Sequence, residues 1–143
     1  MEYIKISGKD FEKQAQQIIF EKESISLTRN FKLPIGISNI SKNHNFDLGC
    51  EKQKVIVECK CHSWTQTGNK PSAKMSIWNE AMFYFMLAPK DYRKILFVRK
   101  QHNLKLNITL AKYYMKTYSH FVPENVEIWE YDSENKKIEV CEI

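Results

Sequence analysis

The segment 44–62 constrains the fold most, because its side chains alternate between apolar and polar on both sides of a short polar turn. A period of two is typical of β-strands, and the turn at residues 50–53 predicts an antiparallel hairpin. Centred between residues 52 and 53, this hairpin gathers apolar side chains on one face: Phe46, Leu48, Val55, Val57 and Cys59. We therefore expect that face to be buried against a helix.

The opposite face of the predicted hairpin carries three charged side chains. The register places Asp47 directly opposite Glu58, and cross-strand neighbours lie about 5 Å apart at Cβ. Lys60 follows two residues later and projects from the same face as Glu58. The sequence thus predicts that two carboxylates and one ammonium group meet on one surface.

Two adjacent carboxylates repel each other unless a proton or a cation lies between them. Mg²⁺ prefers oxygen ligands and keeps several waters, and Mn²⁺ is expected to substitute for it. The predicted ligands are Asp47, Glu58 and the backbone carbonyl of Cys59, and Lys60 is expected to face the attacking water. This set of groups predicts hydrolysis of phosphodiester bonds.

The rest of the chain predicts one α/β domain over residues 1–143, a length that suits a single hydrophobic core. Ser7 and Asp10 resemble a capping box before the first helix. The expected order is a helix at 9–23, strands at 25–33, 45–49 and 54–62, a helix from Asn69 or Ser72 to just before Pro89, a strand at 94–99, a helix at 109–121, and a hairpin of 126–131 with 137–141. Residues 35–42 fit no pattern clearly, and the polar residues 65–71 predict a loop.

Apolar stripes on the three helices predict the sides that pack on the sheet. The first stripe is Phe11, Ala15, Ile18 and Ile19; the second is Met75, Trp78, Ala81, Met82, Phe85 and Met86; the third is Ala111, Tyr114, Met115, Tyr118 and Phe121.

Composition narrows the setting in which the chain works. No apolar run is long enough for a membrane span, and the start MEYIKISGKD lacks the apolar core of a signal peptide, so we expect a cytoplasmic protein. Four irregularly spaced cysteines favour free thiols in a reducing compartment. The net charge of +5 indicates either attraction to a polyanion or simply a solubilising surface.

The residues Phe46-Asp47, followed by Val57-Glu58-Cys59-Lys60, resemble the D…ExK signature of the PD-(D/E)XK nuclease superfamily, with phenylalanine in place of the usual proline. The element order also resembles the restriction-endonuclease-like αβββαβ core, in which helices flank a central mixed sheet. This resemblance implies a Mg²⁺-dependent nuclease that cuts DNA, with RNA as an open alternative. It also implies that Glu12 on the first helix assists the metal site and that Lys74 on the second lies near the scissile phosphate.

Two further residues are candidates for nucleic-acid contacts. Trp64 lies just past the motif and either contacts a nucleic acid or caps the edge of the core. His44 precedes Asp47 by three residues and is a candidate phosphate contact. Because the chain is too short for a separate recognition domain, specificity is expected to come from loops, a homodimer or a companion recognition subunit.

Three other interpretations compete with the nuclease. The charged face is alternatively an ordinary solvated strand surface with a weak cross-strand ion pair. The fold alternatively serves as a non-catalytic nucleic-acid-binding module or partner subunit. A zinc site built from the cysteines and histidines of residues 44–62 is the third, but alternation places Cys59 and Cys61 on one face and His62 on the other, which opposes a tetrahedral site.

Overall fold

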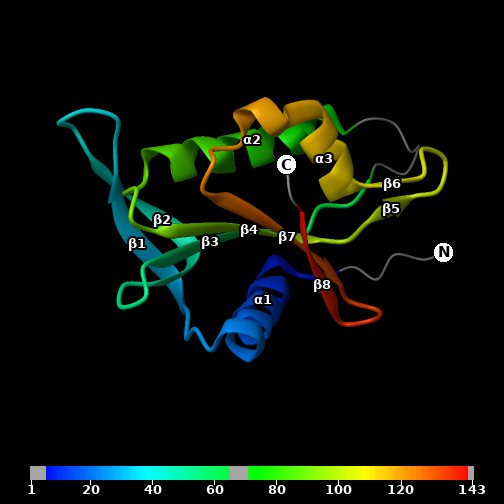
Figure 1. The fold of residues 1–143 in the computed structure, drawn as a ribbon, viewed down its shortest axis with the longest axis horizontal. Helices are drawn as coiled ribbons and strands as arrows, with labels where there is room; N and C mark the ends of the chain where they lie inside the picture. Colours follow the sequence, from blue (N-terminus) through cyan, green and yellow to red (C-terminus); the bar gives the residue numbers. More distant parts are fainter. Residues whose placement is uncertain (1–5, 65–70, 142–143) are drawn as a thin grey trace.

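The computed structural model describes residues 6–64 and 71–141, which form a mixed α/β structure around a six-stranded sheet (Figure 1). The elements are α1 (Gly8–Glu23), β1 (Thr28–Ile35), β2 (Lys42–Cys50), β3 (Val55–Lys60), α2 (Ser72–Leu87), β4 (Arg93–Arg99), β5 (His102–Asn103), β6 (Ile108–Thr109), α3 (Leu110–Tyr118), the short 3-10 helix η1 (Ser119–Phe121), β7 (Val126–Asp132) and β8 (Lys137–Cys141). The predicted order of helices and strands is confirmed, apart from the unpredicted β5–β6 ribbon.

The sheet runs in the order β1-β2-β3-β4-β7-β8. Its outer pairs β1–β2, β2–β3 and β7–β8 are antiparallel, whereas β3–β4 and β4–β7 are parallel. The two parallel steps are those whose connections contain α2 and α3, since a parallel crossover needs a long connection. A central mixed sheet flanked by helices, as predicted, is therefore present.

The sheet is buried on both faces (Figure 1). α2 and α3 cover one face, where Trp78 and Tyr114 contact each other with ring centroids 5.1 Å apart. α1 covers the other face, where Phe11 packs on Phe97 of β4. Burial on both sides explains why the central strand β4 is a continuous apolar run rather than an alternating one.

Residues at the ends of α1 and α3 satisfy backbone groups that the helices leave unpaired. Ser7 caps α1 by accepting a hydrogen bond from the Asp10 N–H at 3.1 Å, as the sequence predicts. Ser24 ends α1 in a left-handed conformation, and its N–H donates to the Phe20 carbonyl at 2.8 Å. Thr109 caps α3 through the Lys112 N–H.

Several boundaries and orientations differ from the predictions. β1 starts at Thr28 and continues through Pro34, which is tolerated because β1 is an edge strand. The third predicted helix ends at Tyr118, and η1 follows. Met86 and Phe121, predicted to face inward, are about half exposed: Met86 lies on the outer side of α2, and Phe121 lies in η1, beyond the end of α3. Most of the loop predicted at 65–71 lies outside the described residues.

None of the helices in the described parts of the chain is long and apolar enough to cross a membrane.

Candidate functional site

The hairpin register predicted for β2 and β3 is confirmed. Leu48 pairs with Val57, and Gly49 pairs with Ile56. In this register the next residues along the two strands are Asp47 and Glu58. The β2–β3 ladder stops just before them, so their side chains lie where the two strands begin to separate.

Asp47 lies at an irregularity of β2 that the sequence pattern did not indicate. The β1–β2 ladder pairs Arg29 with Leu48 and Phe31 with Phe46 but skips the intervening step, where Asn30 has a left-handed backbone with φ of 55°. Phe46 packs on the α2 side of the sheet and Leu48 on the α1 side. The prediction that both share one apolar face is wrong, because strict alternation fails where β1 and β2 are distorted.

The Asp47 carboxylate bonds to the backbone of the neighbouring strand. Its Oδ2 accepts a hydrogen bond from the Cys59 N–H at 2.8 Å. This bond takes the place of the next rung of the ladder and fixes the carboxylate between β2 and β3. Within a strand, the N–H and the carbonyl of one residue point toward the same neighbouring strand. The Cys59 carbonyl therefore lies on the same side of β3 as Asp47.

Glu58 is a buried carboxylate, with 5% of its surface exposed. Its Oε1 lies 3.0 Å from the His44 Nε2, and its Oε2 lies 3.9 Å from the Lys60 Nζ. Burial raises the pKa of Glu58 to about 9, and the neighbouring Asp47 carboxylate adds to the rise, whereas Lys60 opposes it. Glu58 therefore carries a proton at neutral pH in the absence of a bound cation.

The structure brings together Asp47, Glu58 and Lys60, as the sequence predicts. Lys60 projects from the same side of β3 as Glu58, and its side chain stays about one-fifth exposed. Its ammonium group is thus close enough to Glu58 to act on the same ligand and open enough to meet one from solvent. A solvated strand face, the competing interpretation, does not fit the near-complete burial of Glu58.

Glu12 lies close to these groups but has its own partner. Its Oε2 accepts from the Arg29 guanidinium at 2.9 Å. Its negative charge lies within electrostatic reach of β3 and contributes to raising the pKa values of Glu58 and Cys59. Glu12 therefore borders the predicted site with its charge partly neutralised by Arg29.

His44 is a part-buried residue of the site, and its contact with the site is the bond to Glu58. Its ring stacks on Tyr84 of α2, with centroids 3.9 Å apart, and meets Phe46 edge-on at 4.5 Å. Burial is the main reason why its pKa is lowered. Two aromatic contacts and the bond to Glu58 fix the orientation of this imidazole, so His44 holds the carboxylate in place.

The other two predicted nucleic-acid contacts have different surroundings. Lys74 stays partly exposed, and its Nζ donates to the Ser63 carbonyl at 2.6 Å. Trp64 is buried and donates its indole N–H to the Gln101 carbonyl at 2.7 Å. The fold thus covers the ring and places Trp64 at the edge of the core, the second of the two predicted positions, and a nucleic-acid contact for Trp64 stays a prediction.

His62, which the sequence did not single out as a site candidate, lies within electrostatic reach of Lys60 and Lys74. Its Nδ1 accepts a hydrogen bond from the Trp78 indole at 3.1 Å. Burial, followed by the nearby Lys60 and Lys74, lowers the pKa of His62. Alternation had already placed it on the face opposite Cys59 and Cys61, two residues beyond Lys60, but nothing in the sequence pointed to its contact with Trp78.

The cysteines do not gather into a metal site. All four are free thiols, and Cys59 and Cys61 pack toward α1 while His62 bonds to α2. Within the described ranges, no three histidine, cysteine, aspartate or glutamate side chains are arranged to hold a metal ion. The predicted magnesium set has two carboxylates and a backbone carbonyl, a donor set of the kind that Mg²⁺ accepts alongside its waters.

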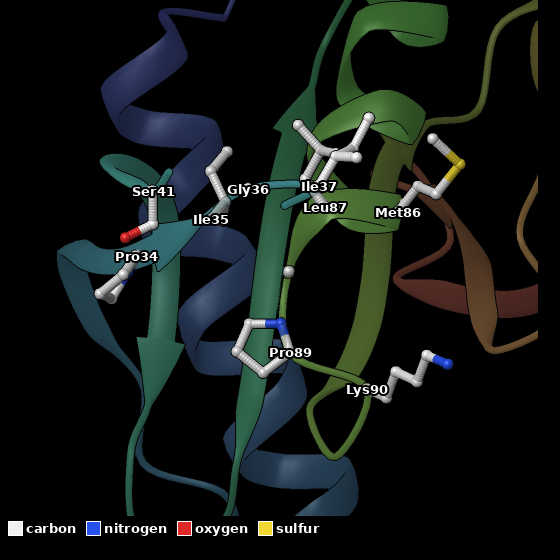
Figure 2. A pocket seen from close by; sticks show the side chains of 10 residues that line it. Pro34, Ile35, Gly36, Ile37, Ser41, Met86, Leu87, Pro89 and Lys90 are labelled. Atoms are coloured by element: carbon white, nitrogen blue, oxygen red, sulfur yellow. The ribbon is translucent and has the colours of Figure 1, made fainter. Parts of the chain in front are cut away.

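A separate hollow of about 540 Å³ lies between the end of β1 and the last turn of α2 (Figure 2). It is lined by Pro34, Ile35, Gly36, Ile37, Ser41, Met86, Leu87, Ala88, Pro89 and Lys90. None of the charged site residues contributes to its wall, so it is distinct from the candidate site.

The sequence matches no protein-family model, no curated protein and no solved structure.

Proposed function

We propose that this chain is a metal-dependent nuclease with a restriction-endonuclease-like core, and that it hydrolyses phosphodiester bonds in DNA. The observation that carries the proposal is the meeting of Asp47, Glu58 and Lys60 where β2 and β3 separate. The order of α1, the first three strands, α2 and β4 supports the same superfamily assignment. The net charge of +5 adds a general attraction to a polyanion.

The two carboxylates and the Cys59 carbonyl fit a hard divalent cation. Glu58 is buried beside Asp47, and this arrangement disfavours its charged form until a cation compensates. Asp47, Glu58 and the Cys59 carbonyl are the groups that would hold Mg²⁺ or Mn²⁺. A bound Mg²⁺ supplies Lewis-acid polarisation of the phosphate and a lowered pKa for a coordinated water.

The remaining groups hold Glu58 in position and neutralise the charge of the phosphate. The Lys60 ammonium lies 3.9 Å from Glu58, one of the proposed metal ligands. At this position Lys60 stabilises the negative charge that develops on the attacked phosphate. His44 holds Glu58 through its Nε2, and the stacked Tyr84 prevents the imidazole from turning away. Glu58 must release its proton before it can bind a cation, so cation binding should strengthen as the pH rises.

A cleavage assay tests the proposal. The wild type, Glu58→Gln and Lys60→Ala are incubated with supercoiled plasmid and branched DNA in Mg²⁺, Mn²⁺ or EDTA. We expect metal-dependent cutting by the wild type and a loss of at least about a hundredfold in each variant, because each removes a ligand or a charge used in the transition state.

Lys112→Ala is the matched control, because Lys112 is an exposed lysine of α3 whose ion-pair partner is Glu139 on the edge strand β8. It should cut like the wild type. A wild type that binds DNA but cuts none of these substrates with either metal contradicts the proposal. That result would favour a non-catalytic binding module or the need for a companion subunit.

A further inference from the structure

The tautomer of His62 follows from its contact with α2. An indole N–H can only donate a hydrogen bond, so the His62 Nδ1 that lies 3.1 Å from the Trp78 Nε1 must accept one. The single proton of the neutral imidazole is then on Nε2. Because Trp78 is fully buried, the core holds the imidazole ring in this orientation.

Burial, reinforced by two neighbouring cations, favours the neutral form of His62. Burial and the cations Lys60 and Lys74 all lower its pKa, so the imidazole is uncharged at pH 7 and offers one N–H donor. Lys74 is held beside it, since the Lys74 ammonium donates to the carbonyl of Ser63, the next residue after His62. A neutral donor and a cation thus lie together beyond Lys60.

The start of α2 adds positive potential to the same place. A helix N-terminus favours negative charge, and acidic residues usually occupy its first turn. The first turn of α2 has no acidic residue and instead carries Lys74. Its N-cap, Pro71, makes no side-chain capping bond within the described residues. By contrast, α1 has Asp10 in its first turn.

We propose that His62 joins Lys74, which the family resemblance already implies lies near the scissile phosphate, in a subsite for the neighbouring phosphate of the bound nucleic acid. This inference rests on the proposed function in taking a nucleic acid strand as the ligand. The His62 Nε2–H donates to one phosphate oxygen, and the Lys74 ammonium neutralises the charge. α2 positions both groups: Lys74 is a residue of this helix, and His62 accepts a hydrogen bond from Trp78 of the same helix.

DNA binding without metal tests the subsite separately from catalysis. The affinity for a 20-base-pair duplex is measured in EDTA at several salt concentrations for the wild type, His62→Asn and Lys74→Gln. Asparagine keeps an oxygen acceptor for the Trp78 indole but has no donor at the position of Nε2. Lys22→Gln is the charge-matched control, because Lys22 lies on the opposite face of the sheet over Trp129.

The two variants should weaken binding in different ways. His62→Asn should weaken it about tenfold without changing the salt dependence, because a neutral donor releases no counterion. Lys74→Gln should weaken binding and reduce the slope of log K against log salt by about 0.9, the value for one phosphate contact. Lys22→Gln should change neither quantity appreciably.

A measurement on the wild type keeps the test independent of how well the variants fold. The side-chain ¹⁵N resonances of His62 should show a protonated Nε2 in the free protein and a shift of Nε2 when the duplex is added. An unchanged Nε2 resonance in DNA-bound protein, or His62→Asn binding as tightly as the wild type, overturns the proposal.

The outcomes separate the two proposals. Cutting by the wild type combined with unaltered binding in both variants leaves the nuclease standing and removes the subsite. Weakened binding in both variants, together with a wild type that never cuts, supports the subsite and contradicts the nuclease. A wild type that does not bind the duplex overturns the subsite, and the cleavage assay then decides the nuclease.

Discussion

Burial and the neighbouring carboxylate of Asp47 both raise the pKa of Glu58. Both disfavour the charged form, and the pKa rises from an ordinary value of 4.5 to about 9. Between these two values the folded protein keeps a proton that the unfolded chain has lost. The folded state therefore loses stability as the pH rises through this window, because unfolding then allows Glu58 to ionise in water.

Replacing Glu58 with glutamine should remove this dependence. Free energies of unfolding from urea denaturation in EDTA, between pH 5 and pH 8.5, should diverge in favour of Glu58→Gln as the pH rises. The difference should grow by at most about 1.4 kcal/mol per pH unit, the limit for one proton. Stabilities that change in parallel would show that Glu58 ionises normally in the folded protein.

At the scale of the strand, β2 combines a close contact with a break in alternation. Gly49 lies under the Phe31 ring of β1, and a Cβ added at Gly49 would lie 2.2 Å from that ring. A glycine inside a strand often marks such a close approach. Two residues earlier, the ladder skips Asp47 and Asn30. The close contact between Phe31 and Gly49 therefore holds β1 against β2 beside Asp47, the residue that bonds to the Cys59 N–H.

Gly49→Ala should destabilise the protein, whereas Gly8→Ala should not. The first change forces Phe31 to move, at a cost of about 1–3 kcal/mol, the usual range for overpacking. The second adds a methyl group to the start of α1, where no atom lies within 4 Å, and should stabilise by up to about 1 kcal/mol. Thermal and urea denaturation of both variants provide the measurement. Equal effects would contradict the contact between Phe31 and Gly49.

Across the whole molecule, stability should be greatest in the middle of the sheet. β3, β4 and β7 each have a neighbouring strand on both sides and contribute to the cores under both layers of helices. β1 and β8 are the edges, and β8 is largely exposed. The site lies at the end of β3, so a stable strand supplies Glu58 and Lys60.

Hydrogen exchange should follow this order. Amide protons of β3, β4 and β7 should exchange slowest, near the rate set by global unfolding, and those of β8 should exchange fastest among the strands of the six-stranded sheet. Exchange measured by NMR or by mass spectrometry of peptides checks the expectation. Fast exchange in β3 would indicate that the site opens locally without unfolding of the sheet.

Much of the fold was predictable because local periodicity carries it. The alternation around residues 50–53 was enough to predict the β2–β3 register, since a slip by one residue would move apolar side chains to the wrong face. The same register placed Glu58 and Lys60 on one side of β3 and Asp47 beside them. The apolar run at residues 94–99 likewise predicted a buried strand, and the structure buries this strand, β4, on both faces.

Other features required the tertiary structure, because they depend on residues distant in sequence. Phe46 packs on Phe85 of α2, beside the step of the β1–β2 ladder where Asn30 has a left-handed backbone. The bond of His44 to Glu58 depends on Tyr84, which stacks on the imidazole from α2.

The sequence alone therefore determined the hairpin, its register and the meeting of Asp47, Glu58 and Lys60, because these depend on the period of side chains along adjacent strands. The burial of Trp64 against Gln101 and the tautomer of His62 set by Trp78 were decided only by packing. Their partners lie 37 and 16 residues away, and such contacts arise only when the helix and strand layers close on one another.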